Sequence, residues 1–184
     1  MNEEIRPRPL LPFILFSLGF LLIVTAVVYM KMMPLPSDPS AVPAQVNYPA
    51  PELTLTDLAG TSHSLAQYRG QVVLVNLWAT WCPPCKAEMP TLQAYQNKHG
   101  DQGFVTVAVN DGDPTSDVTH FVQDLKLTFA VWLDPTYIAT EQAFKTMNLP
   151  SSYVIDRNGT IRLMWVGEIS RAMLEKNVTP IIRE

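Results

Sequence analysis

Residues 72–90 of this 184-residue chain read VVLVNLWATWCPPCKAEMP. The run Val72–Leu77 is nearly continuous in apolar, mostly β-branched residues, which predicts a strand that is buried on both faces. Apolar residues then recur at helical spacing within Pro83–Lys98, which predicts a helix. The only two cysteines of the chain, Cys82 and Cys85, stand where the strand gives way to the helix. The stretch therefore predicts a strand–turn–helix unit with a C-x-x-C motif at the turn.

The C-x-x-C pair fits some kinds of site better than others. A structural zinc site needs four ligands, and the remaining candidates, His63, His99 and His120, are scattered without a second paired motif. Covalent haem attachment needs C-x-x-C-H, and position 86 is Lys86. A purely structural disulfide would gain little by closing so short a loop. The pair is therefore interpreted as a redox-active dithiol, with no metal or other cofactor expected.

The two cysteines have different predicted roles. Cys82 falls at the start of a helix, where the helix dipole and free amides favour a thiolate, so it is the predicted nucleophile. Cys85 lies one turn further in and would resolve the mixed disulfide. Because Pro83 and Pro84 lack an N–H, the amide of Cys85 is the expected donor to the thiolate. A thiolate with so few donors predicts a couple near the reducing end of the range of such dithiols, roughly −270 to −120 mV.

Strand-like and helix-like segments alternate through the rest of the chain. Arg157-Asn158-Gly159-Thr160 is an expected turn between two strands, and Ala59-Gly60 an expected hairpin turn. The order of the segments predicts an α/β domain with a mixed central sheet flanked by helices. Further strands are expected at Leu53–Leu58, Ser62–Leu65, Phe104–Val109, Ala130–Leu133, Ser152–Ile155 and Ile161–Val166, and further helices at Thr115–Leu125, Ile138–Met147 and Arg171–Ile181.

The amino-terminal part has a different composition. Of the 21 residues Leu10–Met30, 17 are apolar and none is charged. As a helix this run would extend roughly 31 Å, which matches the hydrocarbon core of a bilayer. It is longer than the apolar region of a cleaved signal peptide, and it lacks the polar stripe of a buried core helix. We therefore expect a transmembrane anchor at 10–30, after a cytoplasmic tail at 1–9, because Arg6 and Arg8 precede the run and Lys31 follows it.

Proline dominates the segment that follows the expected anchor. Six of the eighteen residues 34–51 are Pro, which predicts a semi-rigid spacer over 31–51 that leads into a folded domain at 52–184. Beyond Lys31 the chain carries 10 Lys and Arg against 15 Asp and Glu, with no basic cluster. This balance argues against binding to nucleic acid.

The motif stretch at 72–90 resembles the active-site segment of the membrane-anchored, thioredoxin-like TlpA/ResA family. The resemblance extends over about Pro49–Glu184 and includes Leu149-Pro150-Ser151-Ser152-Tyr153-Val154-Ile155-Asp156 and the following Asn158-Gly159 turn. It implies a thioredoxin-like fold for residues 52–184.

The resemblance also implies roles for individual residues. Pro150 matches a cis-proline that lies against the C-x-x-C, and the backbone of Leu149 would pair with substrate. Glu88 matches a glutamate that could exchange a proton with the inner thiol, and Asn76 stands where thioredoxin has a buried aspartate. The residues expected to contact substrate are Trp81, Pro83, Pro84, Leu149 and Pro150.

The resemblance implies an extracytoplasmic thiol:disulfide reductase. Its substrates would be disulfides in exported proteins, including apocytochrome c before haem attachment, and a membrane electron carrier of the CcdA/DsbD type would recharge it. A peroxiredoxin-like peroxidase is an alternative, but that chemistry needs P-x-x-x-T-x-x-C, and Val75 and Ala79 occupy the Pro and Thr positions. A thiol oxidase, a disulfide isomerase or a binding protein on the same fold are further alternatives.

Overall fold

The computed structural model describes residues 19, 21–26, 28–29 and 41–184. The chain divides into two compact units, residues 1–38 and 39–184. The described residues of the first unit are helical, but none of the helices within the described residues is long and apolar enough to cross a bilayer. The expected anchor at Leu10–Met30 falls mainly on residues that the structure does not describe, so it stays a prediction.

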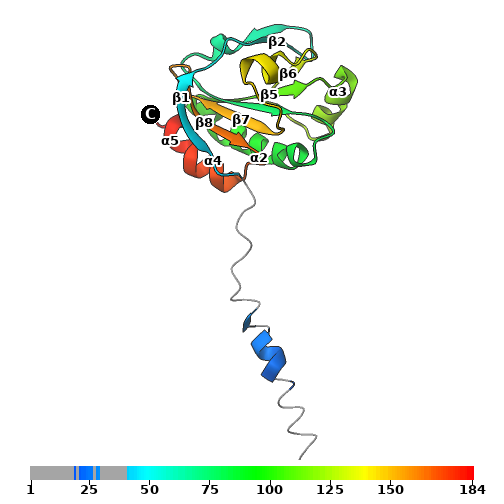
Figure 1. Cartoon of the computed structure of the whole chain (residues 1–184), viewed down its shortest axis with the longest axis vertical. Helices are drawn as coiled ribbons and strands as arrows, with labels where there is room; N and C mark the ends of the chain where they lie inside the picture. Colours follow the sequence, from blue (N-terminus) through cyan, green and yellow to red (C-terminus); the bar gives the residue numbers. More distant parts are fainter. Residues whose placement is uncertain (1–18, 20, 27, 30–40) are drawn as a thin grey trace, which may run out of the picture. The chain divides into compact units, whose positions relative to one another are not determined.

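The second unit is built on one mixed sheet (Figure 1). Its eight strands have the order β1-β8-β7-β4-β5-β6-β2-β3, in which β4, β5 and β6 are parallel and the other neighbours antiparallel. The expected mixed α/β sheet is confirmed. The strands are β1 Ala44–Pro49, β2 Thr54–Asp57, β3 Ser62–Ser64, β4 Val72–Trp78, β5 Phe104–Asp111, β6 Ala130–Asp134, β7 Ser151–Ile155 and β8 Thr160–Val166.

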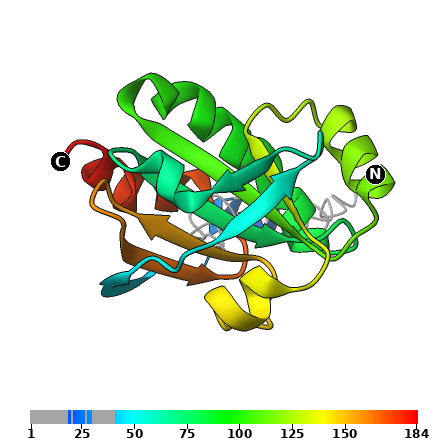
Figure 2. The same cartoon turned by 90° about the horizontal axis from the view of Figure 1, so that it is seen from above.

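Helices and helical turns cover both faces of this sheet. One face packs against α2, α4 and α5, whereas η1 and η3 contribute to the core on the other face. Seen from above, α3 and α5 lie at opposite ends of the unit (Figure 2). The helical elements are η1 Leu65–Tyr68, α2 Pro83–His99, η2 Gly100–Gln102, α3 Thr115–Asp124, η3 Ile138–Ala143, α4 Arg171–Asn177 and α5 Thr179–Ile182.

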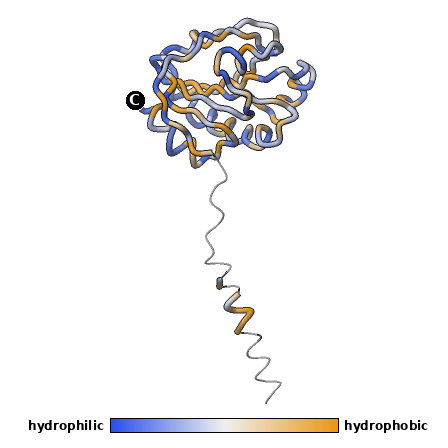
Figure 3. The backbone as a smooth tube through the Cα atoms, in the orientation of Figure 1, coloured by the Kyte–Doolittle hydropathy of each residue, from blue (hydrophilic) through white to orange (hydrophobic). Residues whose placement is uncertain are grey.

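Strand β4 lies at the centre of the sheet, and all of its residues are buried. Val73, Val75 and Leu77 belong to one core cluster, whereas Leu74 and Trp78 belong to the other. When the chain is coloured by residue hydropathy, apolar residues are concentrated on the central strands (Figure 3). The nearly continuous apolar run in the sequence thus reflects a strand that packs on both faces.

Strand β1 corrects the expected spacer at 31–51. Ala44–Pro49 pairs antiparallel with β8, for example Tyr48 with Ile161, and so belongs to the folded unit. The prolines in this region suggested a spacer, but residues 45–48 contain no proline and can donate backbone hydrogen bonds at an open sheet edge.

Two expected helices also differ from the structure. The segment Arg171–Ile181 is divided into α4 and α5, and Pro180 stands in the first turn of α5, where its missing N–H does no harm. In the segment Ile138–Met147 only η3 is helical, a single turn bounded by left-handed residues Tyr137 and Lys145. The remaining expected strands and helices are confirmed to within a few residues.

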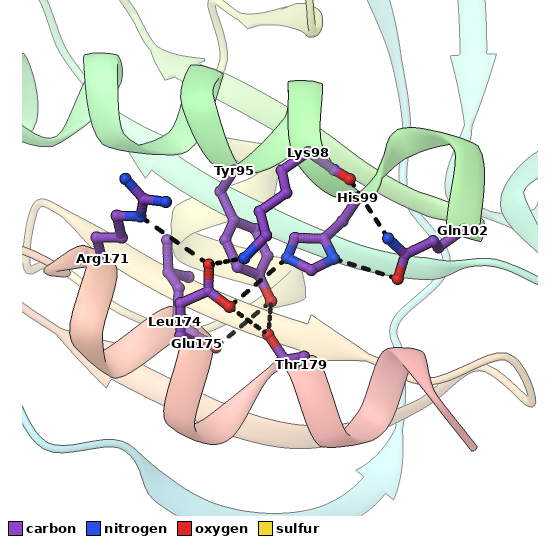
Figure 4. A network of polar contacts seen from close by, with 8 residues as sticks. All are labelled: Tyr95, Lys98, His99, Gln102, Arg171, Leu174, Glu175 and Thr179. Atoms are coloured by element: carbon purple, nitrogen blue, oxygen red, sulfur yellow. Dashed lines mark hydrogen bonds and ion pairs between the residues drawn. The ribbon is translucent and has the colours of Figure 1, made fainter.

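A polar network joins the end of α2 to α4 and α5 (Figure 4). The Glu175 carboxylate accepts hydrogen bonds from Lys98 Nζ at 2.6 Å and Thr179 Oγ1 at 3.1 Å. His99, a buried residue, places Nε2 3.7 Å from the same carboxylate. The Tyr95 hydroxyl lies 2.9 Å from Thr179 Oγ1. One carboxylate therefore ties the last two helices to the helix that begins at the C-x-x-C.

We predict that Glu175→Gln lowers the free energy of unfolding by about 1 kcal/mol at neutral pH. The hydrogen bond from Lys98 holds the pKa of Glu175 below its ordinary value of 4.5. A lowered pKa stabilises the folded state above the unfolded pKa, and this contribution disappears as the pH falls through the folded pKa. Urea unfolding of the full chain in mild detergent should therefore show a difference at pH 7 that shrinks below about pH 4.5. The control Glu184→Gln, which removes a more exposed ion pair with Arg162, should have the smaller effect; equal effects would contradict the prediction.

Candidate active site

The C-x-x-C forms the first turn of α2. Cys82 is the N-cap, in extended conformation, and its Sγ accepts a hydrogen bond from the Cys85 amide at 3.3 Å. Pro83 and Pro84 occupy the positions after the cap, where a helix has no internal acceptors for N–H groups. The amide of Cys85 is thus the donor to the outer sulfur, as the two prolines led us to expect.

The two cysteines are joined by a disulfide, with their Cα atoms 5.3 Å apart. Cys85 is fully buried and Cys82 is 3% exposed. Around Cys82 the surface is formed by Trp81, which is 67% exposed, and by the exposed Pro83 and Pro84. The helix thus presents its outer sulfur at a largely apolar surface and keeps the inner sulfur in the core.

The Leu149-Pro150 segment lies at the same edge of the sheet as the C-x-x-C. The pairing of Leu77 with Ser151 brings the start of β7 beside the end of β4. The Leu149-Pro150 peptide bond is cis, which confirms the cis-proline that the resemblance implied. Pro150 accepts a hydrogen bond from the Gly167 amide at 2.8 Å, whereas Leu149 makes no backbone hydrogen bond to any residue within 41–184. Leu149 therefore offers a free N–H and C=O next to the disulfide.

Glu88 lies behind the disulfide rather than in solvent. It is three residues after Cys85, on the same side of α2, and it is fully buried. Its Oε1 accepts a hydrogen bond from Asn76 Nδ2 at 2.7 Å, and its Oε2 accepts one from the Ile169 amide at 2.9 Å. Asn76 also donates to Ser152 Oγ at 2.9 Å. Strand β4 and the loop after β8 thus contact this carboxyl group directly, and strand β7 contacts it only through Asn76.

Burial dominates the acidity of Glu88. Loss of solvation raises its pKa from 4.5 to about 7, although the hydrogen bonds from Ile169 and Asn76 act in the opposite direction. The nearby charge of Glu168 raises the pKa further. Near neutral pH, Glu88 can therefore hold or release a proton beside the buried sulfur.

Several residues around the site were not found from the sequence. Asp113 accepts hydrogen bonds from the Thr80 amide at 2.6 Å and from Asn110 Nδ2 at 2.7 Å, and so holds the turn that precedes Trp81. Ile169 and Ser152, which fix Glu88 and Asn76, were also missed. The sequence gives no sign that the backbone amide of Ile169 has such a role, but Asn110 and Asp113 lie within four residues of the end of a predicted strand, where a role at the site could have been expected. Within residues 41–184 no group of three or more His, Cys, Asp or Glu could hold a metal ion.

We predict that Glu88→Gln flattens the dependence of stability on pH between pH 4.5 and pH 7. Because the folded pKa of Glu88, about 7, exceeds the ordinary value of 4.5, its contribution is fully present below pH 4.5 and is lost as the pH rises through 7. The wild-type protein should lose up to about 3 kcal/mol relative to the variant over this range. Urea unfolding of the oxidised proteins at a series of pH values measures the difference, and parallel pH profiles would contradict the assignment.

Comparison with known proteins agrees with this geometry. Residues 46–164 match the family described as the AhpC/TSA family. The thiol-disulfide oxidoreductase ResA of Geobacillus kaustophilus is 35% identical over 135 residues, which cover 72% of this chain and 75% of that protein. The thioredoxin-like protein YneN of Bacillus subtilis is 33% identical over 132 residues, which cover 70% and 76%.

A solved structure extends the comparison to the fold. The thiol:disulfide interchange protein of Chlorobium tepidum TLS, a thioredoxin family protein, superposes with a TM-score of 0.67 at 26% identity. The match covers 76% of this chain and 99% of that one. With its thioredoxin-like fold and its C-x-x-C disulfide, the chain belongs to the AhpC/TSA family and, within it, to the ResA-like thiol-disulfide oxidoreductases.

Proposed function

We propose that the protein is an extracytoplasmic reductase of disulfides in exported proteins. The observation that carries the proposal is the juxtaposition of two features at one sheet edge: the Cys82–Cys85 disulfide at the start of α2, and the unbonded backbone of Leu149 before cis-Pro150. An extended substrate segment can add to such a backbone through main-chain hydrogen bonds. The disulfide of the bound substrate would then lie over Cys82.

The proposed reaction starts from the reduced dithiol. The Cys82 thiolate attacks one sulfur of the substrate disulfide, forms a mixed disulfide and expels the other substrate sulfur as a thiolate. The Cys85 thiol then loses its proton and attacks Cys82 Sγ, which releases the second substrate sulfur as a thiolate. Both released thiolates take up protons. The substrate has gained two electrons, and the enzyme ends with the Cys82–Cys85 disulfide.

Glu88 is proposed to handle the proton of the inner thiol. It shares the buried side of α2 with Cys85, and burial raises its pKa to about 7. A group with a pKa near the working pH can accept and return a proton in one cycle. Asn76 and the Ile169 amide hold both carboxyl oxygens in place for this transfer.

The substrate and the electron donor are proposed from the family resemblance. Apocytochrome c before haem attachment is one expected substrate among exported proteins. A membrane carrier of the CcdA/DsbD type is the expected donor, because the oxidised enzyme must be reduced after each cycle. Anchoring the enzyme in the same membrane would raise the effective concentration of one partner at the other.

We predict that Cys82→Ser abolishes insulin-disulfide reduction, with a fall of about two orders of magnitude or more. Cys85→Ala should instead accumulate a mixed disulfide, because the outer thiolate still attacks but nothing resolves the intermediate. Mass spectrometry of the trapped species in native membranes identifies the substrates. The Cys82→Ala/Cys85→Ala double variant is the control and should trap nothing. Reduction of insulin by the Cys82→Ser variant would refute the proposed nucleophile.

We also propose that Leu10–Met30 spans the membrane once, with the amino terminus in the cytoplasm. Seventeen of its 21 residues are apolar, and Arg6 and Arg8 before it outnumber Lys31 after it. The catalytic unit would then lie outside the cytoplasm, where exported proteins acquire disulfides.

Labelling with a membrane-impermeant maleimide tests this topology. In a Cys82→Ser/Cys85→Ser background, an added Asp101→Cys places one thiol on the exposed η2 turn. We expect this thiol to react in intact cells. The matched Asn2→Cys variant in the same background should react only after lysis. The reverse pattern would place the catalytic unit in the cytoplasm and overturn the proposal.

A further inference from the structure

Leu149 is one of the residues that line a cavity of about 230 Å³. Its walls come from the end of β5, from the η3 turn and from the segment that leads to cis-Pro150. We call it the η3 pocket. It is lined by Asp111, Tyr137, Thr140, Glu141, Thr146, Met147 and Leu149.

The strand register places the η3 pocket at the edge of the sheet that carries the disulfide. Trp78, at the end of β4, pairs with Asn110, and Asp111 follows as the last residue of β5. Leu149 is shared between the pocket and the proposed site of substrate pairing. A substrate segment on Leu149 would therefore bring a side chain next to its cysteine into reach of the pocket.

The charged groups of the η3 pocket are two carboxylates, Asp111 and Glu141, and neither has all of its oxygens hydrogen bonded within residues 41–184. Asp111 Oδ1 accepts a hydrogen bond from Thr140 Oγ1 at 2.9 Å, whereas its Oδ2 has no hydrogen-bond partner among residues 41–184. Glu141 is exposed, and within the same residues its carboxylate makes no hydrogen bond or ion pair with a side chain. None of the residues that line the pocket is Lys or Arg. The pocket thus offers carboxylate oxygens that lack a cationic partner.

Neighbouring carboxylates strengthen this negative character. Burial raises the pKa of Asp111, and the charges of Asp134, Asp113 and Glu141 raise it further. Asp134 is itself satisfied by the amides of Ile138 and Ala139, at 2.9 and 2.7 Å. Asp113 is engaged by Thr80 and Asn110. A cation near Asp111 would therefore relieve repulsion among several carboxylates at once.

Met147 and Tyr137 add apolar surface to the pocket that suits an aliphatic stem. Met147 is 85% exposed, and Tyr137 is 44% exposed. The Tyr137 ring lies directly over Gly112, where an added Cβ would come within 2.5 Å of the hydroxyl. Lys and Arg side chains combine an apolar stem with a cationic end. Such a side chain could lay its stem on Met147 and Tyr137 and bring its charge to Asp111 and Glu141.

We propose that the η3 pocket binds a Lys or Arg side chain located next to the disulfide cysteine of the substrate, and so determines which protein disulfides react fastest. This inference depends on the proposed disulfide exchange and specifies its substrate class. The pocket selects substrates by charge, while the Leu149 backbone binds the main chain without regard to sequence.

Disulfide peptides test the proposal. Three forms of one cyclic disulfide peptide carry Lys, norleucine or Glu at the position before one of the cysteines. Three further forms carry the same residues at the position after that cysteine. The full chain, reduced beforehand, is mixed with each peptide at low salt, and single-turnover rates are measured after acid quenching. We expect Lys to react about tenfold faster than norleucine at one of the positions, with Glu slower still. The advantage of Lys should shrink in 0.5 M salt, a concentration that we choose because it screens exposed charges.

Pocket variants separate this effect from the general chemistry. Glu141→Gln, at an exposed position, should reduce the advantage of Lys, and Glu141→Lys should reverse it in favour of Glu. For each variant the rates with the Lys and Glu peptides are divided by its own rate with the norleucine peptide, so that any general change in reactivity cancels. Asp101→Asn, which removes an exposed charge on η2, is the matched control and should leave the preference intact.

The outcomes distinguish failure of this inference from failure of the proposed function. Equal rates for the three peptides at every position, or an undiminished preference for Lys in Glu141→Lys, would overturn the η3 pocket as a specificity site while leaving the reductase proposal in place. No reduction of any peptide would overturn the proposed function itself.

Discussion

The complete burial of strand β4 is the constraint on which the rest of the structure depends. Because side chains on both of its faces lie in a core, the strand cannot slip by one residue without moving apolar groups out of one core and Asn76 out of its hydrogen bonds. The chain leaves this strand at Trp78 and starts α2 at Pro83, after four intervening residues. The position of the disulfide is thereby tied to the register of the central sheet. The reactive disulfide is thus positioned by one of the most buried strands of the molecule.

The same strand also links the disulfide to a buried acid. Asn76 is the one polar residue of β4 that reaches across to α2, and it holds Glu88 together with the Ile169 amide. Burying a carboxyl group costs free energy unless the group is hydrogen bonded or neutral. Here both solutions apply, because two donors contact the group and its pKa rises to about 7. The free energy that is spent on burying Glu88 is spent near Cys85, whose thiol must lose a proton when it is oxidised.

Three loops meet at the carboxyl edge of the parallel strands, where we propose that substrates bind. The turn before α2 presents the outer sulfur among exposed Trp81 and the two prolines. The Leu149-Pro150 segment offers unbonded backbone groups. The η3 segment adds the Glu141 carboxylate and the exposed side chain of Tyr137 near Asp111, the last residue of β5. Under the two proposals, chemistry and main-chain binding would be separate from side-chain selection, and the last could vary without disturbing the first two.

The sequence by itself determined the central strand, the helix after it and the mixed α/β class, because these depend on the local periodicity of apolar residues. It also determined the redox pair, because a C-x-x-C at the start of a helix fits few other kinds of site. The resemblance added cis-Pro150 and the importance of Glu88. Only the tertiary structure decided that Ala44–Pro49 is an edge strand, since pairing with β8 depends on a partner more than a hundred residues away. It alone decided the partners of Glu88, because one of them is a backbone amide at Ile169, which no side chain announces. The η3 pocket likewise required the structure, since Asp111, Glu141 and Met147 line one cavity only because the end of β5 and the start of β7 lie at the same edge of the sheet.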